Sequence, residues 1–282
     1  MTSGNRKSFV AMGQTGCAYV AVLIMAFGAV VLTRPVPAWA GDEEPTVEAV
    51  MAKYIEALGG KAALEKIHNR VTKADMEVSP PGMTMKVTAW EAAPNLSYVL
   101  VESESMGRIE EGTDGKVSWS NHPMMGAKVR EGAELDRALK DATFNSDLKW
   151  RELYKTVELA GTEEMEGKPC YKIVATPEDG QPETWYVDKE SSLKIKVQRI
   201  MEGPMGQVPI TTTIGDFKKV DGVMIAYKTV QEVASMQKAV VTLTSVEHNV
   251  DLPKDRFALP EEIRSLIELQ KESAAEEAKE TE

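Results

Sequence analysis

A long succession of short strand-like segments is the feature that most limits the folds open to this 282-residue chain. Apolar and polar residues alternate with a period of two, as over Met83–Trp90, and Gly, Pro, Asn or Asp turn signals separate the segments. Further strands are predicted over 96–100, 106–111, 116–120, 155–160, 169–176, 183–188, 192–201, 207–217, 222–233 and 236–248. An open sheet of about eleven or twelve strands curls or closes.

Helical segments precede and interrupt these strands. Apolar residues at helical spacing predict a helix over 47–58, ended by Gly59-Gly60, and a second short helix over 61–67. A third helical segment, 131–154, separates two blocks of strands, which suggests a helix packed on or into a curved sheet. A closed or half-closed barrel of this size has an interior too wide for its own side chains. Helices, a ligand or both must therefore occupy it.

Residues 1–40 have the features of a secretory signal peptide. Arg6 and Lys7 precede the apolar run Cys17–Leu32, and Ala38-Trp39-Ala40 provides an A-x-A cleavage site. Cleavage after Ala40 would leave one domain over 41–260 and an acidic C-terminal helix or disordered tail over 261–282. The alternative is an uncleaved anchor, although the run is short for a membrane span.

Charge and cysteine content exclude several classes of protein. Removing residues 1–40, which carry three basic and no acidic side chains, changes the net charge from −11 to −14. Such an acidic chain would repel phosphates, so no nucleic-acid partner is expected. Cys170 is the one cysteine of the mature sequence, which rules out an intramolecular disulfide. A buried, unreactive thiol is the expected role for Cys170.

Catalytic motifs are absent from the sequence. His68, His122 and His248 do not have the spacing of a zinc site, and no nucleophile elbow or glycine-rich phosphate loop occurs. Neither catalytic residues, a metal nor a cofactor is therefore predicted, and the chain is not expected to be an enzyme. Methionine is abundant and could indicate copper binding, but it also suits adaptable apolar cavities. The methionines beside Gly or Pro are interpreted as the rim of a cavity: Met124, Met125, Met201 and Met205.

Several segments, in order and spacing, resemble the periplasmic outer-membrane lipoprotein-sorting proteins of the LolA/LolB-like superfamily. The resemblance rests on Glu56–Ile67 (EALGGKAALEKI), Asp114–Trp119 (DGKVSW), Gly161–Ile173 (GTEEMEGKPCYKI), Trp185–Lys196 (WYVDKESSLKIK), Gly215–Lys228 (GDFKKVDGVMIAYK) and Ser245–Pro260 (SVEHNVDLPKDRFALP). It implies an α+β, mostly β fold: an incomplete antiparallel barrel of about eleven strands with helices covering the open side.

The resemblance also implies a function. Members of the superfamily carry lipoprotein acyl chains, or a related lipid, through the periplasm, with an inner-membrane donor and an outer-membrane acceptor as partners. An arginine latches the covering helices in such carriers, and Arg108 is the suggested counterpart here. The alternatives are a binding module or sensor for another apolar molecule, and an envelope scaffold.

An acyl chain would bind by burial against apolar residues of the strands, since each CH₂ contributes roughly 0.8 kcal/mol on leaving water. Large aromatics such as Trp119 could line a cavity or belong to an ordinary core. The predicted lining residues are Met83, Met85, Val87, Leu96, Tyr98, Leu100, Met106, Trp119, Leu193, Ile195, Val197, Val208, Ile210, Val223 and Ile225.

Overall fold

The computed structural model describes residues 44–178, 180–203, 206–234 and 236–280. The predicted signal peptide and the rim residue Met205 lie outside these ranges. The helices are α1 (Val47–Ala57), α2 (Lys61–Glu65), α3 (Gly132–Asp141), the 3-10 helix η1 (Ser146–Lys149), α4 (Trp150–Leu153) and α5 (Glu261–Glu280). The strands are β1 (Asn69–Ser79), β2 (Met83–Ala92), β3 (Leu96–Ser103), β4 (Gly107–Thr113), β5 (Ser118–His122), β6 (Gly126–Val129), β7 (Thr156–Met165), β8 (Lys168–Thr176), β9 (Glu183–Asp188), β10 (Lys194–Gly203), β11 (Gly206–Val220), β12 (Val223–Val233) and β13 (Gln237–His248).

The thirteen strands of the described residues form one antiparallel sheet in the order β6-β5-β4-β3-β2-β1-β13-β12-β11-β10-β9-β8-β7. Consecutive strands pair as hairpins within each of two blocks, β1–β6 and β7–β13, and the β1–β13 pairing joins the two blocks. Within the described residues β6 and β7 are the edges, so the barrel is not closed. The mostly β fold with an incomplete barrel is therefore confirmed, with thirteen strands rather than about eleven.

Two strands are absent from the sequence-based prediction, β1 and β6. Charged residues occur on both faces of β1, where Arg70, Lys73 and Glu77 obscure the alternation. The other strand, β6, has only four residues, which is too few for a periodic signal. Pairing stabilises these strands instead, since β1 pairs with the distant β13 and β6 pairs with the adjacent β5.

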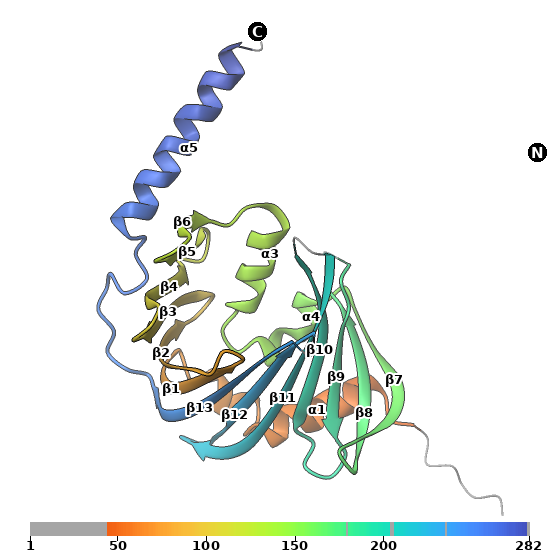
Figure 1. Ribbon diagram of the computed structural model, residues 1–282. Coiled ribbons are helices and arrows are strands. Elements are labelled where there is room, and N and C mark those ends of the chain that lie inside the picture. Colours follow the sequence, from red (N-terminus) through yellow and green to blue (C-terminus); the bar gives the residue numbers. More distant parts are fainter. Residues whose placement is uncertain (1–43, 179, 204–205, 235, 281–282) are drawn as a thin grey trace, which may run out of the picture. The chain divides into compact units, whose positions relative to one another are not determined.

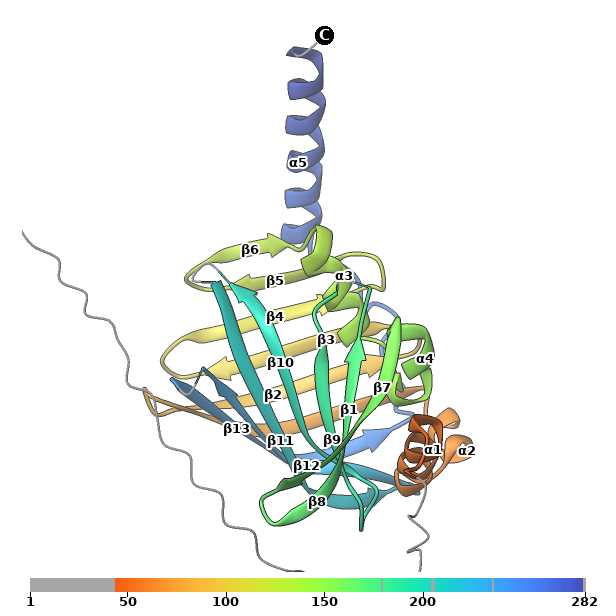
Figure 2. The same ribbon diagram turned by 90° about the vertical axis from the view of Figure 1, so that its right-hand side faces the viewer.

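The sheet curves so that its two blocks face each other, with α3 between them in both views (Figures 1 and 2). We call the face toward α3 the inner face and the opposite one the outer face. Because side chains alternate along a strand, the pairing register assigns most residues to a face. Thr72 of β1 lies on the inner face, and its partner Ala89 of β2 shares that face.

The helix α1 packs on the inner face of the second block. Thr46 caps it by accepting a hydrogen bond from the Ala49 amide at 3.2 Å. Val50, Met51 and Tyr54 are buried in a core that includes residues of β8, β9 and β12. Burial of this apolar stripe, rather than the local sequence alone, holds the helix in place.

The predicted helical insert 131–154 is divided into α3, η1 and α4. Asn145 interrupts it in a left-handed conformation, with φ of 52°. The Asn145 amide donates to the carbonyl oxygens of Leu64 (2.9 Å) and Ile67 (3.4 Å), which fixes the break against the end of α2. The insert therefore follows the curvature of the inner face in short pieces.

An aromatic cluster lies on the outer face of the first block. Tyr98 packs between Trp90 and Trp119, with ring centroids 5.4 and 6.0 Å away. Arg256, from the segment that links β13 to α5, lies over Trp90 and Tyr98. This segment covers the outer face, and α5 follows it with Ile263 fully buried. Both faces of β3 are therefore covered.

Candidate functional site

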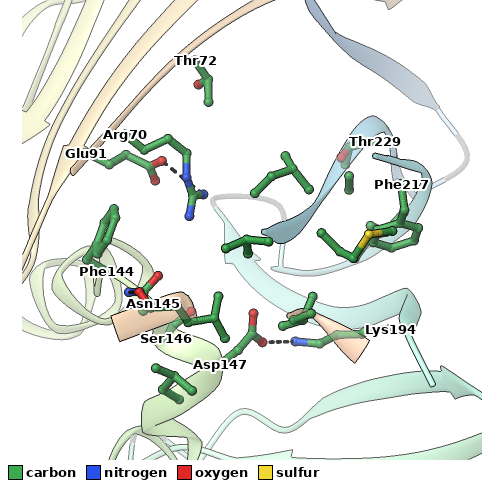
Figure 3. A pocket seen from close by; sticks show the side chains of 18 of the residues that line it. Arg70, Thr72, Glu91, Phe144, Asn145, Ser146, Asp147, Lys194, Phe217 and Thr229 are labelled. Carbon is green, nitrogen blue, oxygen red and sulfur yellow. Dashed lines mark hydrogen bonds and ion pairs between the residues drawn. The ribbon is translucent and has the colours of Figure 1, made fainter. Parts of the chain in front are cut away.

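A cavity of about 460 Å³ lies on the inner face, beneath the loop that joins α3 to η1 (Figure 3). This volume falls within the usual range for small-ligand sites. Apolar side chains from α1, α2, the loop and the second block of strands form most of its wall. They are Tyr54, Leu58, Leu64, Phe144, Leu148, Val197, Ile214, Phe217, Val223, Met224, Ile225, Ala226 and Leu243.

Two ion pairs stand in the wall of this first cavity. Lys194 Nζ lies 2.9 Å from Asp147 Oδ1, and its ammonium group also lies over the rings of Tyr54 and Trp185. Burial raises the pKa of the Tyr54 hydroxyl well above its usual value, and the nearby Asp147 carboxylate adds to the rise. Tyr54 is therefore a neutral wall residue, and the Asp147–Lys194 pair ties η1 to β10.

On the opposite wall, Arg70 of β1 lies 3.8 Å from Glu91 of β2. The Arg70 guanidinium also stacks over Phe144, 5.5 Å from the ring centroid. The cavity thus combines an apolar floor with a few charged groups at its margin, as in binding sites for amphiphilic molecules.

Glu183 of β9 fastens α3 and the end of α4 to the sheet. Its carboxylate accepts hydrogen bonds from Lys140 Nζ (2.8 Å), Tyr154 OH (3.1 Å) and Trp185 Nε1 (3.3 Å). Burial alone would raise the pKa of Glu183, but the hydrogen bond and charge of Lys140 outweigh it, so the pKa is lowered. Glu183 is therefore an anion at neutral pH.

A second cavity, also about 460 Å³, lies between α3 and the first block of strands. Glu91 and Asp141 line both cavities, so the two adjoin. The second cavity is polar, with Arg130, Arg137 and Arg199 in its wall. Burial raises the pKa of Asp141, and the charges of Arg199, Lys140 and Arg137 oppose the rise.

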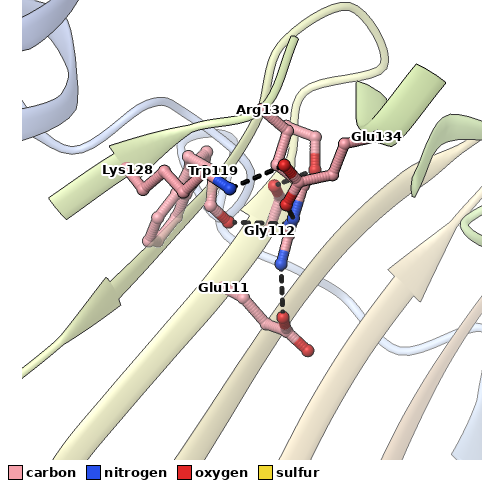
Figure 4. A network of polar contacts seen from close by, with 7 residues as sticks. Glu111, Gly112, Trp119, Lys128, Arg130 and Glu134 are labelled. Atoms are coloured by element: carbon pink, nitrogen blue, oxygen red, sulfur yellow. Dashed lines mark hydrogen bonds and ion pairs between the residues drawn. The ribbon is translucent and has the colours of Figure 1, made fainter. Parts of the chain in front are cut away.

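Arg130 is the best-fixed of these arginines (Figure 4). It donates to Ser118 Oγ (2.8 Å), to the Trp119 carbonyl oxygen (3.2 Å) and to Glu111 Oε2 (2.8 Å). Glu134, one turn into α3, lies 3.5 Å from Arg130 and 2.6 Å from Lys128. This network attaches the start of α3 to β4, β5 and β6.

Most of the predicted lining residues lie on the inner face or in the core beside it. Val197, Val223 and Ile225 line the first cavity directly, and Leu193 belongs to the same core. The pairing register places the others on the inner face: Met83, Met85, Val87, Val208 and Ile210.

Six predicted lining residues lie elsewhere. The register places Leu96, Tyr98, Leu100 and Trp119 on the outer face, where Arg256 of the segment after β13 lies over Tyr98. The expectation for these four differs from the structure because both faces of β3 are apolar, so alternation does not identify the inner one. Met106 lies in the β3–β4 turn, and Ile195 lies at a register shift in β10; both are half-buried.

The predicted rim and latch residues are also dispersed. Met124 and Met125 are 81% and 80% exposed in the β5–β6 turn, while Met201 reaches the second cavity. Arg108 bonds to Tyr98 and Glu110 within the sheet. Arg108 therefore points outward and does not reach the helices. Ion pairs of Lys128, Arg130, Lys140, Lys194 and Arg199 join the helices to the sheet instead.

Sequence reasoning missed the charged residues of the site: Arg70, Glu91, Arg137, Lys140, Asp141, Asp147, Glu183 and Lys194. Charges in strands and amphipathic helices usually face solvent, and only the curvature of the sheet turns these inward. A basic residue opposite an acidic one in paired strands, as at Arg70 and Glu91, is the one available signal.

The described residues show no cluster of three or more His, Cys, Asp or Glu side chains arranged to hold a metal. Cys170 is fully buried, and burial raises the pKa of its thiol. None of the helices over the described ranges is long and apolar enough to cross a membrane.

Comparisons with known proteins agree with this architecture. A LolA superfamily protein from Nitrosomonas europaea superimposes with a TM-score of 0.54 at 16% identity, covering 76% of this chain and 98% of the other. A DUF1329 family protein from Desulfovibrio piger gives 0.54 at 14% identity, covering 75% and 96%. A domain assigned as an outer membrane lipoprotein-sorting protein, from Vibrio parahaemolyticus, gives 0.52 at 14%, covering 75% and 97%.

No curated protein matches the sequence. A family model described as an uncharacterized protein-like family matches residues 113–261, which is more than half of the chain. The matched stretch includes the covering helices α3 and α4 and every strand from β7 to β13. The chain therefore belongs to this uncharacterized protein-like family, and its fold is similar to that of a LolA superfamily protein.

Proposed function

We propose that the protein is a periplasmic carrier that holds the acyl chain of a lipoprotein, or of a related lipid, in the first cavity. The observation that carries the proposal is this apolar cavity of about 460 Å³ between the sheet and its covering helices. The LolA-superfamily fold supports it, since a related domain is assigned to outer-membrane lipoprotein sorting. The cargo would pass from an inner-membrane donor toward an outer-membrane acceptor.

Burial of the chain supplies the binding free energy. A chain of about 14 to 16 carbons contributes roughly 0.8 kcal/mol for each CH₂ removed from water. Loss of translational and conformational freedom offsets a large part of this gain. Enough remains for reversible binding, which a carrier requires.

Release requires the covering helices α3, η1 and α4, which we call the cover, to separate from the sheet. Two of the pairs that hold it remain partly exposed: the side chains of Lys194 and Asp147 are 16% and 34% exposed, and those of Arg199 and Asp141 are 29% and 45%. Ion pairs with this exposure contribute little to stability because water competes for them. An acceptor that binds the lipid more tightly can therefore draw it out as the cover opens.

Native mass spectrometry of the protein purified from periplasmic extract tests both the cargo and the export. We expect a chain that begins at Gly41, because Ala38-Trp39-Ala40 precedes it, together with co-purifying acylated species. A protein that is always empty and fails to bind a fluorescent fatty acid would contradict the carrier proposal. A full-length chain in the membrane fraction would contradict cleavage after Ala40.

A tryptophan placed in the cavity tests the location of the ligand. Thr72 lines the first cavity from β1, and Thr72→Trp should lower affinity for a fluorescent fatty acid about tenfold or more, because the indole occupies ligand volume. Fluorescence titration measures the change. Lys73→Trp is the matched control. Lys73 is the next residue along β1, and its side chain is exposed and points to the outer face. Unchanged affinity in a folded Thr72→Trp variant would place the ligand elsewhere.

A further inference from the structure

The second cavity contains a cation with buried N–H groups that no described residue binds. Arg137 projects from α3 into this cavity. Its Nε and Nη2 atoms are buried and have no hydrogen-bond partner among the described residues. Buried polar atoms are nearly always paired, so two such atoms in one side chain indicate a missing partner.

The acidic residues around the cavity are already engaged with other cations. Arg70 lies beside Glu91 at 3.8 Å, and Arg199 beside Asp141 at 3.5 Å.

The other two acidic residues that line the second cavity are also paired with cations. Glu111 accepts from Arg130 at 2.8 Å, and Glu134 accepts from Lys128 at 2.6 Å. Each of the four carboxylates that line the second cavity thus has a cationic partner other than Arg137. The Arg137 guanidinium therefore keeps buried N–H groups that are available to a ligand.

From this arrangement we propose that Arg137 binds the anionic head group, a carboxylate or phosphate, of an amphiphile whose chain occupies the first cavity. A guanidinium presents two parallel N–H groups that match the oxygens of either group. The two cavities adjoin at Glu91 and Asp141, so one ligand can span them. The inference rests on the proposed function and adds to it the chemistry of the ligand.

Three ligands with the same chain test the proposal: palmitate, hexadecyl phosphate and uncharged hexadecanol. Isothermal titration calorimetry on the purified protein should show the two anions binding about tenfold or more tightly than the alcohol. Arg137→Gln should remove this preference, so that the two anions bind no more tightly than hexadecanol. Arg137→Lys should keep part of it, because the charge remains without the paired N–H geometry.

Arg264→Gln is the matched control, since Arg264 is exposed on α5, and it should keep the full preference. Thermal unfolding of the unliganded protein provides a second measurement. Because Arg137→Gln removes a guanidinium whose buried Nε and Nη2 atoms have no hydrogen-bond partner among the described residues, its Tm should equal or exceed that of the wild type.

The outcomes separate the two proposals. Equal binding of all three ligands, or an anion preference that survives in Arg137→Gln, would overturn the role of Arg137 and leave the carrier function standing. A Tm lowered by Arg137→Gln would also overturn it, since that result shows a structural role. Failure of all three ligands to bind would overturn the carrier function, and the inference with it. A preference for only one anion would support the site and identify its head group.

Discussion

Glu183 shows how one residue can hold the covering helices on the inner face of the sheet. Its side chain is 8% exposed and receives three hydrogen bonds, from Lys140, Tyr154 and Trp185. Removing one member of such a buried pair leaves the other charge without compensation. The free energy that Glu183 contributes should therefore exceed that of the surface pairs.

We expect Glu183→Gln to lower the free energy of unfolding by about 3 kcal/mol at pH 7. Because the pKa of Glu183 is lowered in the folded protein, the ionised form stabilises it above the unfolded value of about 4.3. This contribution is lost as the pH falls through the folded pKa. The difference between wild type and variant should therefore shrink below pH 4.3, as measured by urea unfolding at several pH values.

Glu163→Gln is a suitable control, because Glu163 pairs with Lys172 at 2.9 Å but is 42% exposed. A surface pair of this kind is worth less than about 1 kcal/mol. Equal losses in the two variants would show that Glu183 does not fasten the cover.

At the scale of elements, the position of α1 depends on one close backbone approach. The Leu58 carbonyl accepts a hydrogen bond from the Met224 amide at 2.8 Å, which brings the end of α1 onto the β11–β12 turn. Gly59 follows with φ of 120°, and a Cβ there would lie 2.4 Å from the Gly222 carbonyl oxygen. Neither the conformation nor the space allows a side chain.

Gly59→Ala should lower the free energy of unfolding by more than 2 kcal/mol, because backbone strain and a backbone clash add. Chemical denaturation measures the loss. Gly167→Ala isolates the strain, since Gly167 has φ of 80° and a Cβ there would meet no atom within 4 Å, and should cost only about 1 kcal/mol. Similar losses at the two positions would mean that α1 shifts freely away from the turn.

At the scale of the whole molecule, local patterns determine more of the fold than of the site. Alternation and turns such as Asp221-Gly222 identify most strands, because hairpins join neighbours in sequence. The inward face of β3 is not predictable, since the apolar Tyr98 packs against Trp90 on the outer face while the apolar Val99 lines the second cavity. The charged residues of the cavities are also unpredictable, because the curved sheet alone brings Asp147 to Lys194 and Asp141 to Arg199.

The pairing of β1 with β13 has a consequence for how the protein acquires its structure. Asn69 and Val250, which bond to each other at this junction, are 181 positions apart in the chain. During synthesis β1 lacks this neighbour until nearly the whole domain has followed. Contacts between such distant segments form slowly, and an unpaired strand edge attracts other chains. The newly synthesised chain therefore depends, for a time, on protection of that edge against aggregation.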